Sequence, residues 1–180
     1  MQKGLYFIAL LPPEVIMNEV LSIQKKISEN YDSHVALKAP AHITLQKPFF
    51  RMKSQEPDLI LKLNNFSTGH SGFEISLNGY GSFPPRTIFI RPEMTDDLKI
   101  LYKSLYFFLK TQLLFNDKEV GNYKFNPHIT IANRDLSKEG FDKAWKYYKG
   151  KEYKRKFMLN NISLLKHNGK NWDIYRKFNL

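Results

Sequence analysis

The chain has 180 residues, of which 42% are apolar and 25% charged, and these values are typical of a single soluble globular domain. They exclude disordered and fibrous classes, and the absence of cysteine excludes disulfides, thiolate metal sites and a cysteine nucleophile. The net charge of +11 favours polyanions such as RNA but is equally met on the surfaces of ordinary soluble proteins.

The apolar start of the chain is too short for a membrane span, and no signal-peptide cleavage site follows it. We therefore expect a cytoplasmic monomer, with residues 1–180 in one domain and no association with a membrane.

Hydrophobic periodicity predicts the elements of the first third of the chain. The run Gly4–Leu11 is almost continuously apolar, as in a strand covered on both faces. Residues 12–14, Pro-Pro-Glu, open a helix with proline and an acid in its first turn, and apolar residues at helical spacing continue it to about Asn30. Two strands are predicted at Val35–Lys38 and His42–Phe50, and a short helix at Pro57–Asn64.

The middle of the chain alternates between strand and helix patterns. A half-buried strand is predicted at Phe73–Asn78, a loop at Gly79–Pro85 and another strand at Thr87–Arg91. Thr95 and two acidic residues then cap the strongest predicted helix, whose apolar positions run to Phe108. A polar segment through residues 116–126 follows.

The last third of the chain is predicted to contain a helix and a hairpin. The helix starts at Ser137 and ends at Gly150. The strands Phe157–Lys166 and Trp172–Phe178 flank an Asn-Gly turn signal. The basic run 149–156 fits either an RNA-tracking strip or a strand edge guarded by lysines. Since strands and helices do not alternate regularly, the predicted fold class is α+β.

One tripeptide, His-Ile-Thr, occurs twice, at residues 42–44 and 128–130, and an apolar residue follows each copy. In a strand, the histidine and threonine of each copy point to one side while the apolar residues point to the other. A proline lies just before each copy, as expected where a chain bends into a strand at its rim. Each copy therefore predicts a strand with one polar face and one core face.

This pair of motifs contains the groups that phosphodiester hydrolysis needs. A base must activate water and an acid must protonate the leaving oxygen, and His42 and His128 can hold one neutral and one protonated imidazole near neutral pH. The hydroxyls of Thr44 and Thr130 can donate to the phosphoryl oxygens. No metal is required. Which histidine is the base and which the acid stays open, because the two motifs are interchangeable.

The paired motifs resemble the signature of the 2H phosphoesterases, the 2'-5' RNA ligase-like or cyclic phosphodiesterase superfamily, which is two copies of His-x-Thr/Ser-x. The resemblance implies two pseudo-symmetric lobes, each a mostly antiparallel sheet with outer helices, and an active-site cleft between them lined by both motifs. It also implies a hydrolase without a cofactor that acts on a 2',3'-cyclic phosphate or a related nucleotide or RNA-end phosphodiester. Residues 46–50 depart from the aromatic-leucine-glycine pattern of bacterial members, which leaves the substrate open.

Substrate-binding candidates are cations that could neutralise phosphate and aromatic rings that could stack on a base. The loop 83–86, Phe-Pro-Pro-Arg, resembles a loop that lies at the cleft in several family members. The candidates are Arg86, Arg134, Lys47, Lys124, Phe83 and Tyr6. For the cations the alternative is surface charge, and for most aromatic residues it is the core.

Other interpretations stay open. Each motif alone fits a strand with a hydrogen-bonded histidine, whereas a metal site lacks the three or four ligands that zinc requires. His34, His70 and His167 lack a threonine two residues later, so we assign them to the surface or to structural roles. The main alternative function is a non-catalytic module that binds RNA or nucleotide phosphate in the same cleft. An enzyme acting on a non-nucleotide phosphodiester is a third.

Overall fold

Eight strands and five α-helices lie within residues 2–121 and 124–180, the part of the chain that the computed structural model describes. The strands are β1 (Lys3–Leu10), β2 (Ile43–Met52), β3 (Phe73–Phe83), β4 (Thr87–Pro92), β5 (Ile129–Ala132), β6 (Lys154–Leu159), β7 (Asn161–His167) and β8 (Trp172–Asn179). The helices are α1 (Glu14–Tyr31), α2 (Glu56–Ser67), α3 (Asp96–Thr111), α4 (Asp117–Val120) and α5 (Lys138–Tyr148), with short 3₁₀ helices at Val35–Lys38 and Lys53–Gln55. Two positions of the predicted polar segment, 122 and 123, lie outside the described residues. Within the described ranges, no helix combines the length and apolar character needed to cross a membrane.

The eight described strands form one sheet in the order β6-β3-β4-β5-β2-β1-β7-β8, and neighbouring strands are antiparallel. The two central strands, β2 and β5, pair only at Ile43 and Ile129, so this contact joins two halves of four strands each. The predicted α+β class and the two mostly antiparallel lobes are confirmed. Both strands that carry the repeated tripeptide lie at the junction of the lobes.

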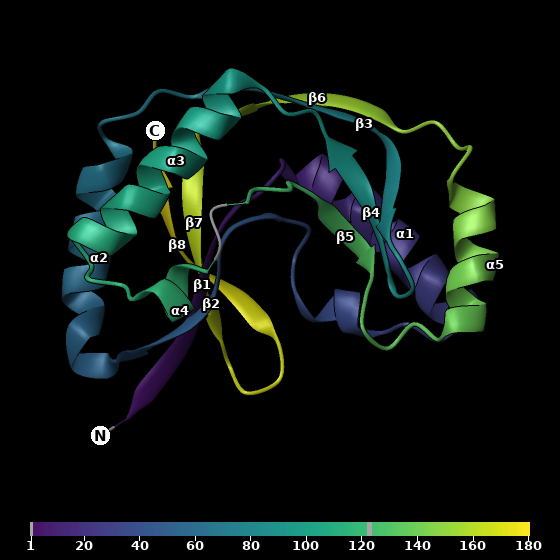
Figure 1. Ribbon diagram of the computed structural model, residues 1–180, viewed down its shortest axis with the longest axis horizontal. Helices are drawn as coiled ribbons and strands as arrows, with labels where there is room; N and C mark the ends of the chain where they lie inside the picture. Colours follow the sequence, from purple (N-terminus) through teal and green to yellow (C-terminus); the bar gives the residue numbers. More distant parts are fainter. Residues whose placement is uncertain (1, 122–123) are drawn as a thin grey trace.

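Helices cover the two halves of the sheet separately. Figure 1 shows the sheet as an arch, with α2 and α3 beside the half that contains β7 and β8, and α1 and α5 beside the half that contains β4 and β5. The apolar side chains between these layers are fully buried, among them Ile8 in β1, Leu63 in α2 and Ile90 in β4. Burial of this kind contributes about 2 kcal/mol per large side chain, which drives the helices onto the sheet.

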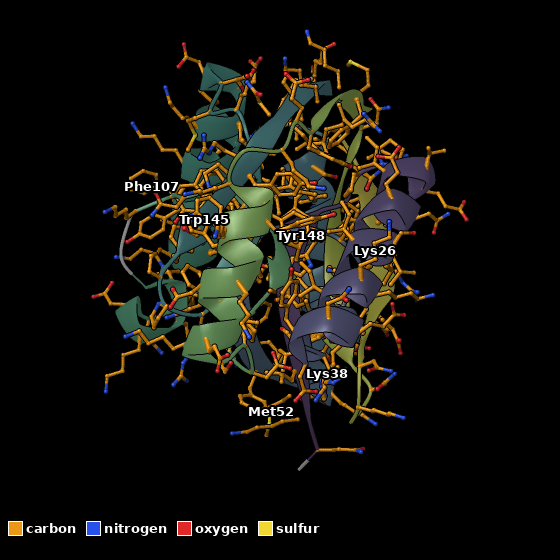
Figure 2. All side chains as sticks on the ribbon, turned by 90° about the vertical axis from the view of Figure 1, so that its right-hand side faces the viewer. Lys26, Lys38, Met52, Phe107, Trp145 and Tyr148 are labelled. Carbon is orange, nitrogen blue, oxygen red and sulfur yellow. The ribbon has the colours of Figure 1, made fainter. Side chains whose placement is uncertain are left out.

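Helices α1 and α5 lie next to each other, with Tyr148 of α5 between them (Figure 2). Tyr148 is 5% exposed, and its ring centroid is 5.1 Å from that of Tyr80 in β3. The predicted caps are present, because Thr95 accepts a hydrogen bond from the Leu98 N–H and Ser137 accepts one from the Gly140 N–H. Side-chain caps satisfy backbone donors that the first turn of a helix leaves free.

The predicted strand at Val35–Lys38 is wrong, because this segment is a 3₁₀ helix. Both edges of β2 are already occupied by β1 and β5, so no strand can pair beside it. The carboxylate of Asp135 instead accepts the backbone N–H groups of His34 (2.5 Å) and Val35 (2.9 Å) and the Ser33 hydroxyl (2.9 Å). Asp135 thereby ties the segment to the loop after β5.

The predicted loop at Gly79–Pro85 is largely strand, because β3 continues to Phe83. Gly79 has a φ of 67°, and the pairing of β3 with β4 shifts register at this point, as in a bulge. Gly81 lies opposite Phe89, whose ring would be 2.4 Å from a Cβ at position 81. The glycines therefore serve a bulge and a close ring approach within a strand rather than a loop.

The single strand predicted at Phe157–Lys166 is two strands that lie in opposite halves of the sheet. β6 pairs with β3, and β7 pairs with β1 and β8, with Asn160 between them. An apolar run carries no signal for the point at which a chain crosses from one lobe to the other. The predicted Asn-Gly hairpin between β7 and β8 is confirmed. β6 is an edge strand, and its cations, Lys154, Arg155 and Lys156, pair with acidic side chains, as in a guarded edge.

Candidate active site

The two His-Ile-Thr copies lie side by side where the lobes meet. Ile43 of β2 pairs with Ile129 of β5, so the middle residues of the two motifs lie opposite each other and, because the strands are antiparallel, the motifs run in opposite directions. Both isoleucines are 0% exposed, whereas the histidine before each and the threonine after each are only partly buried. The expected division into a core face and a polar face is present in both strands.

Both imidazoles are held by the same local contact. Nδ1 of His42 lies 2.7 Å from the Pro40 carbonyl oxygen, and Nδ1 of His128 lies 2.7 Å from the Asn126 carbonyl oxygen. A carbonyl can only accept, so each Nδ1 carries its proton and donates it. In the neutral form Nε2 is then the basic nitrogen, and the carbonyl fixes the ring orientation. The prolines near each motif thus belong to bends that present a carbonyl two residues before each histidine.

A cavity of about 430 Å³ is lined by all four motif side chains, His42, Thr44, His128 and Thr130. Neither threonine hydroxyl has a hydrogen-bond partner among the described residues, so both are available to a ligand. Below Thr130, the buried amide of Gln24 in α1 donates to the Thr130 carbonyl oxygen at 2.9 Å. This bond attaches α1 to β5 at the floor of the site, and together these residues form the candidate active site.

His42 is neutral over most of the pH range. Burial is the main cause that lowers its pKa to about 4, the hydrogen bond to the Pro40 carbonyl opposes the shift, and the charge of nearby His128 adds to it. At neutral pH the ring is therefore unprotonated, which is the form from which a general base acts.

The stability of the fold should depend on His42 between about pH 6.5 and pH 4. In this window the unfolded chain protonates His42 and the folded chain does not, so the free energy of unfolding falls as the pH falls. The contribution is at most about 3 kcal/mol. We expect urea unfolding to show that, from pH 7 to pH 4, wild type loses more of its free energy of unfolding than His42→Gln does. A difference that stays constant over this range would contradict the assignment.

Aromatic rings form walls beside both histidines. Phe7 of β1 lies 4.8 Å from the His42 ring, and Trp172 packs edge-on against Phe7 at 4.6 Å. On the other side, Phe83 lies edge-on to His128 at 5.3 Å, and Phe89 is 5.4 Å away. Such contacts restrict the rings and exclude water from one side of each imidazole.

A second cavity of about 350 Å³ adjoins the first and shares Thr44 and His128 with it. Phe83, Lys47 and Lys124 line this second cavity, and Phe83 is 41% exposed. Three of the predicted substrate-binding residues therefore lie next to the motifs. An exposed ring beside two cations is suited to a base and its phosphate.

The remaining substrate-binding candidates fall in different places. Arg134 lines the first cavity, at a turn where its φ is 45°. Arg86 is exposed in the turn between β3 and β4 and lines neither cavity. Tyr6 is 0% exposed and donates a hydrogen bond to Glu56, so the structure places it in the core and not in the site. His34, His70 and His167 hydrogen-bond to nearby residues outside the site, as the sequence suggested.

Several residues of the site carried no recognisable signal in the sequence. Phe7, Gln24 and Trp172 come from elements far from the motifs along the chain. Lys38 and Asn133 lie within four residues of a motif but match no part of its pattern. Asn133 is held by the Thr87 hydroxyl, which donates to its side-chain oxygen at 3.0 Å. Phe7, Gln24 and Trp172 reach the motifs only through the tertiary fold, which local sequence patterns do not specify.

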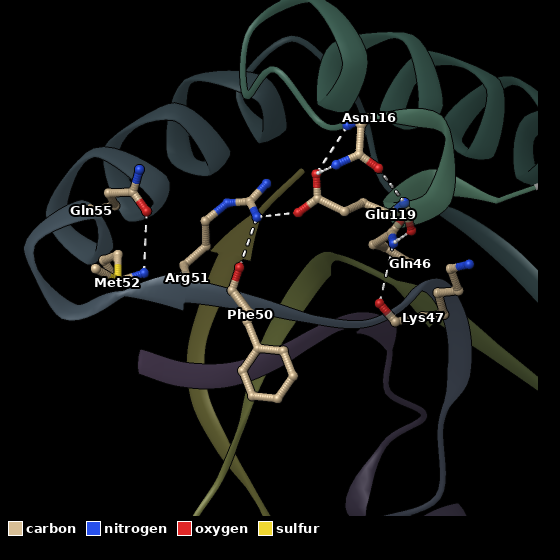
Figure 3. A network of polar contacts seen from close by, with 8 residues as sticks. All are labelled: Gln46, Lys47, Phe50, Arg51, Met52, Gln55, Asn116 and Glu119. Atoms are coloured by element: carbon tan, nitrogen blue, oxygen red, sulfur yellow. Dashed lines mark hydrogen bonds and ion pairs between the residues drawn. The ribbon is translucent and has the colours of Figure 1, made fainter. Parts of the chain in front are cut away.

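A polar network beside the site includes Gln46, the first residue after the first motif (Figure 3). Gln46 is buried, and its amide donates to the Glu119 carbonyl oxygen at 2.7 Å. Arg51 forms an ion pair with the Glu119 carboxylate at 2.5 Å, and Asn116 caps the N–H of Glu119 at 3.1 Å. These contacts hold α4 against β2, where α4 ends at the wall of the second cavity.

Comparison with known proteins supports the arrangement. The family model described as the 2'-5' RNA ligase superfamily matches residues 12–171. BH1439 of Halalkalibacterium halodurans, whose name assigns it provisionally to the phosphoesterases, is 26% identical over 179 residues, which are 97% of this chain and 96% of BH1439. TT0787 of Thermus thermophilus has a TM-score of 0.69 and 21% identity, covering 98% of this chain and 97% of its own. Escherichia coli LigT complexed with 3'-AMP has a TM-score of 0.69 and 17% identity, covering 99% of both chains. These two solved structures share the fold.

Proposed function

Because the chain belongs to the 2'-5' RNA ligase superfamily of 2H phosphoesterases, we propose that it hydrolyses the 2',3'-cyclic phosphate of a nucleotide or an RNA end without a metal ion. The observation that carries this proposal is the matched pair of imidazoles, each fixed through Nδ1 to a carbonyl two residues before it, in one cavity with two uncommitted threonine hydroxyls. The proposed catalytic residues are His42, Thr44, His128 and Thr130.

The lowered pKa of His42 suggests that this residue is the base, which assigns the role of acid to His128. His42 is neutral at pH 7, so its Nε2 accepts a proton from water as the water oxygen attacks phosphorus. The bond from phosphorus to one ribose oxygen breaks, and protonated His128 donates its Nε2 proton to that oxygen. Thr44 and Thr130 donate to the non-bridging oxygens, whose charge grows in the transition state. The product is a phosphomonoester. His42 then releases the proton it accepted to solvent and His128 takes one up, so both residues return to their starting forms.

Two further observations support a nucleotide substrate. LigT, which shares the fold, has been solved with 3'-AMP, the kind of monoester that opening a 2',3'-cyclic phosphate at the 2' oxygen produces. In the present chain, Lys47, Lys124 and Phe83 line the cavity that adjoins the histidines. Cations and an exposed ring are the groups that hold a phosphate and a base.

Turnover of cytidine 2',3'-cyclic phosphate in the presence of EDTA tests the proposal. We expect wild-type protein to convert it to a single monoester, and chromatography of the 2' and 3' isomers identifies which ribose oxygen leaves.

Binding of the nucleotide without turnover would contradict catalysis and support the alternative, a non-catalytic RNA or nucleotide-phosphate module. If the folded protein neither binds nor cleaves the nucleotide, the result would favour an enzyme that acts on a non-nucleotide phosphodiester.

A further inference from the structure

A cavity other than the one that holds the histidines is larger than it. A cavity of about 530 Å³ lies between α1, β8 and the crossing from β6 to β7. It shares Gln24, Ala39 and Pro40 with the candidate active site. Pro40 is the residue whose carbonyl fixes His42, so the two cavities are separated by one short segment.

The wall of this cavity is apolar but open to solvent. Leu21 of α1, Met158 of β6 and Ile174 of β8 line it, and they are 37%, 55% and 40% exposed. These residues come from three elements that are distant in the sequence, yet all three face one hollow. Exposed apolar side chains that gather in a hollow mark a binding site more often than the same residues scattered singly.

Uncommitted polar groups surround this apolar wall. The side-chain amides of Asn18 and Asn160 and the ammonium of Lys177 line the cavity, and none has a hydrogen-bond partner within residues 2–121 and 124–180. Glu14 is the other charged residue in the lining, so the cavity is close to neutral although the whole chain carries a net charge of +11.

This combination fits a nucleobase better than it fits a phosphate. A base presents two flat faces that pack on apolar side chains and an edge of donors and acceptors that amides can pair with. A phosphate would need several cations or backbone N–H groups, and here Lys177 and Glu14 offset each other. Because the two cavities share Gln24, Ala39 and Pro40, a base bound here would lie next to the cavity that contains the histidines.

We infer that this cavity binds the base of the nucleotide on the 5' side of the terminal cyclic phosphate. The inference rests on the proposed function and narrows its substrate class, because it makes an RNA end a better substrate than a mononucleotide. The terminal nucleotide occupies the cavities beside the histidines, and the strand continues over Ala39 and Pro40 toward α1.

The test compares kcat/KM for the dinucleotide ApC ending in a 2',3'-cyclic phosphate with kcat/KM for cytidine 2',3'-cyclic phosphate. For wild type we expect a ratio of about ten or more, since packing of one base supplies a preference of at least this size. Asn18→Ala and Ile174→Ala should each lower the ratio about fivefold or more. Asn65→Ala and Ile100→Ala, matched changes at exposed positions of α2 and α3, should leave the ratio as in wild type.

The outcomes separate this inference from the proposed function. If both substrates are turned over with a kcat/KM ratio near one, the inferred base site is wrong and the proposed phosphodiesterase activity is supported. A high ratio that neither Asn18→Ala nor Ile174→Ala lowers also overturns it, because the preference then arises elsewhere. If neither substrate is turned over, both the proposed function and the inferred base site are contradicted.

Discussion

Replacing His42 or His128 with glutamine is expected to lower kcat/KM for a nucleoside 2',3'-cyclic phosphate by about 10² to 10⁴, the usual contribution of one acid or base. Glutamine retains a polar side chain of similar reach but cannot transfer a proton at neutral pH. Because the two histidines act in one step, the double variant should be little worse than either single variant. Steady-state rates measured with EDTA present check these expectations.

His34→Gln and His167→Gln are the matched controls, since these histidines hydrogen-bond near the surface and line neither of the cavities that contain the motifs. Both controls should retain wild-type rates. Retention of most activity in folded His42→Gln or His128→Gln would exclude two-histidine catalysis.

Replacing Glu56 with alanine is expected to destabilise the fold by about 3 to 5 kcal/mol, because it leaves a partly buried cation and two phenols without their partner. The Glu56 carboxylate, 17% exposed, accepts hydrogen bonds from Tyr6, from Lys166 at 2.5 Å and from Tyr175 at 2.6 Å. Burial by itself would raise the pKa of Glu56, but the hydrogen bonds from Lys166, Tyr175 and Tyr6 outweigh it and lower the pKa to about 2. One carboxylate thus joins α2 to β1, β7 and β8.

Urea unfolding followed by circular dichroism measures the loss for Glu56→Ala. The control is Glu152→Ala, which removes an exposed ion pair with Lys154 and should cost about 0.5 kcal/mol or less. Equal losses in the two variants would contradict a structural role for Glu56.

Much of the fold could be predicted because local chemistry and tertiary packing agree over most of the chain. The caps at Thr95 and Ser137 and the Asn-Gly turn in the last hairpin act within a few residues, so the sequence states them directly. The strand predicted at Val35–Lys38 was wrong because here distant contacts, and not local chemistry, determine the conformation of the segment. Its conformation depends on Asp135, a partner about one hundred positions away, and on the occupied edges of β2.

The repeated motif predicted the centre of the candidate site, and the strand register brings its four residues into one cavity. The prediction that Tyr6 binds substrate was wrong because β1 is apolar on both faces. The sequence of such a strand does not show which of its faces is turned toward the motifs. In the structure Phe7 contacts the His42 ring, and its neighbour Tyr6 points into the opposite layer. Arg86 matched a loop pattern, but the extension of β3 to Phe83 leaves Arg86 in an exposed turn.

A ³¹P NMR time course of cytidine 2',3'-cyclic phosphate with the protein and EDTA tests the central claim most directly, because cyclic diester and monoester give separate signals. The two-histidine account predicts that the cyclic signal is replaced by one monoester signal with wild type and persists with the His42→Gln/His128→Gln double variant. A cyclic signal that persists with wild type, or that disappears equally fast with the folded double variant, would contradict the account.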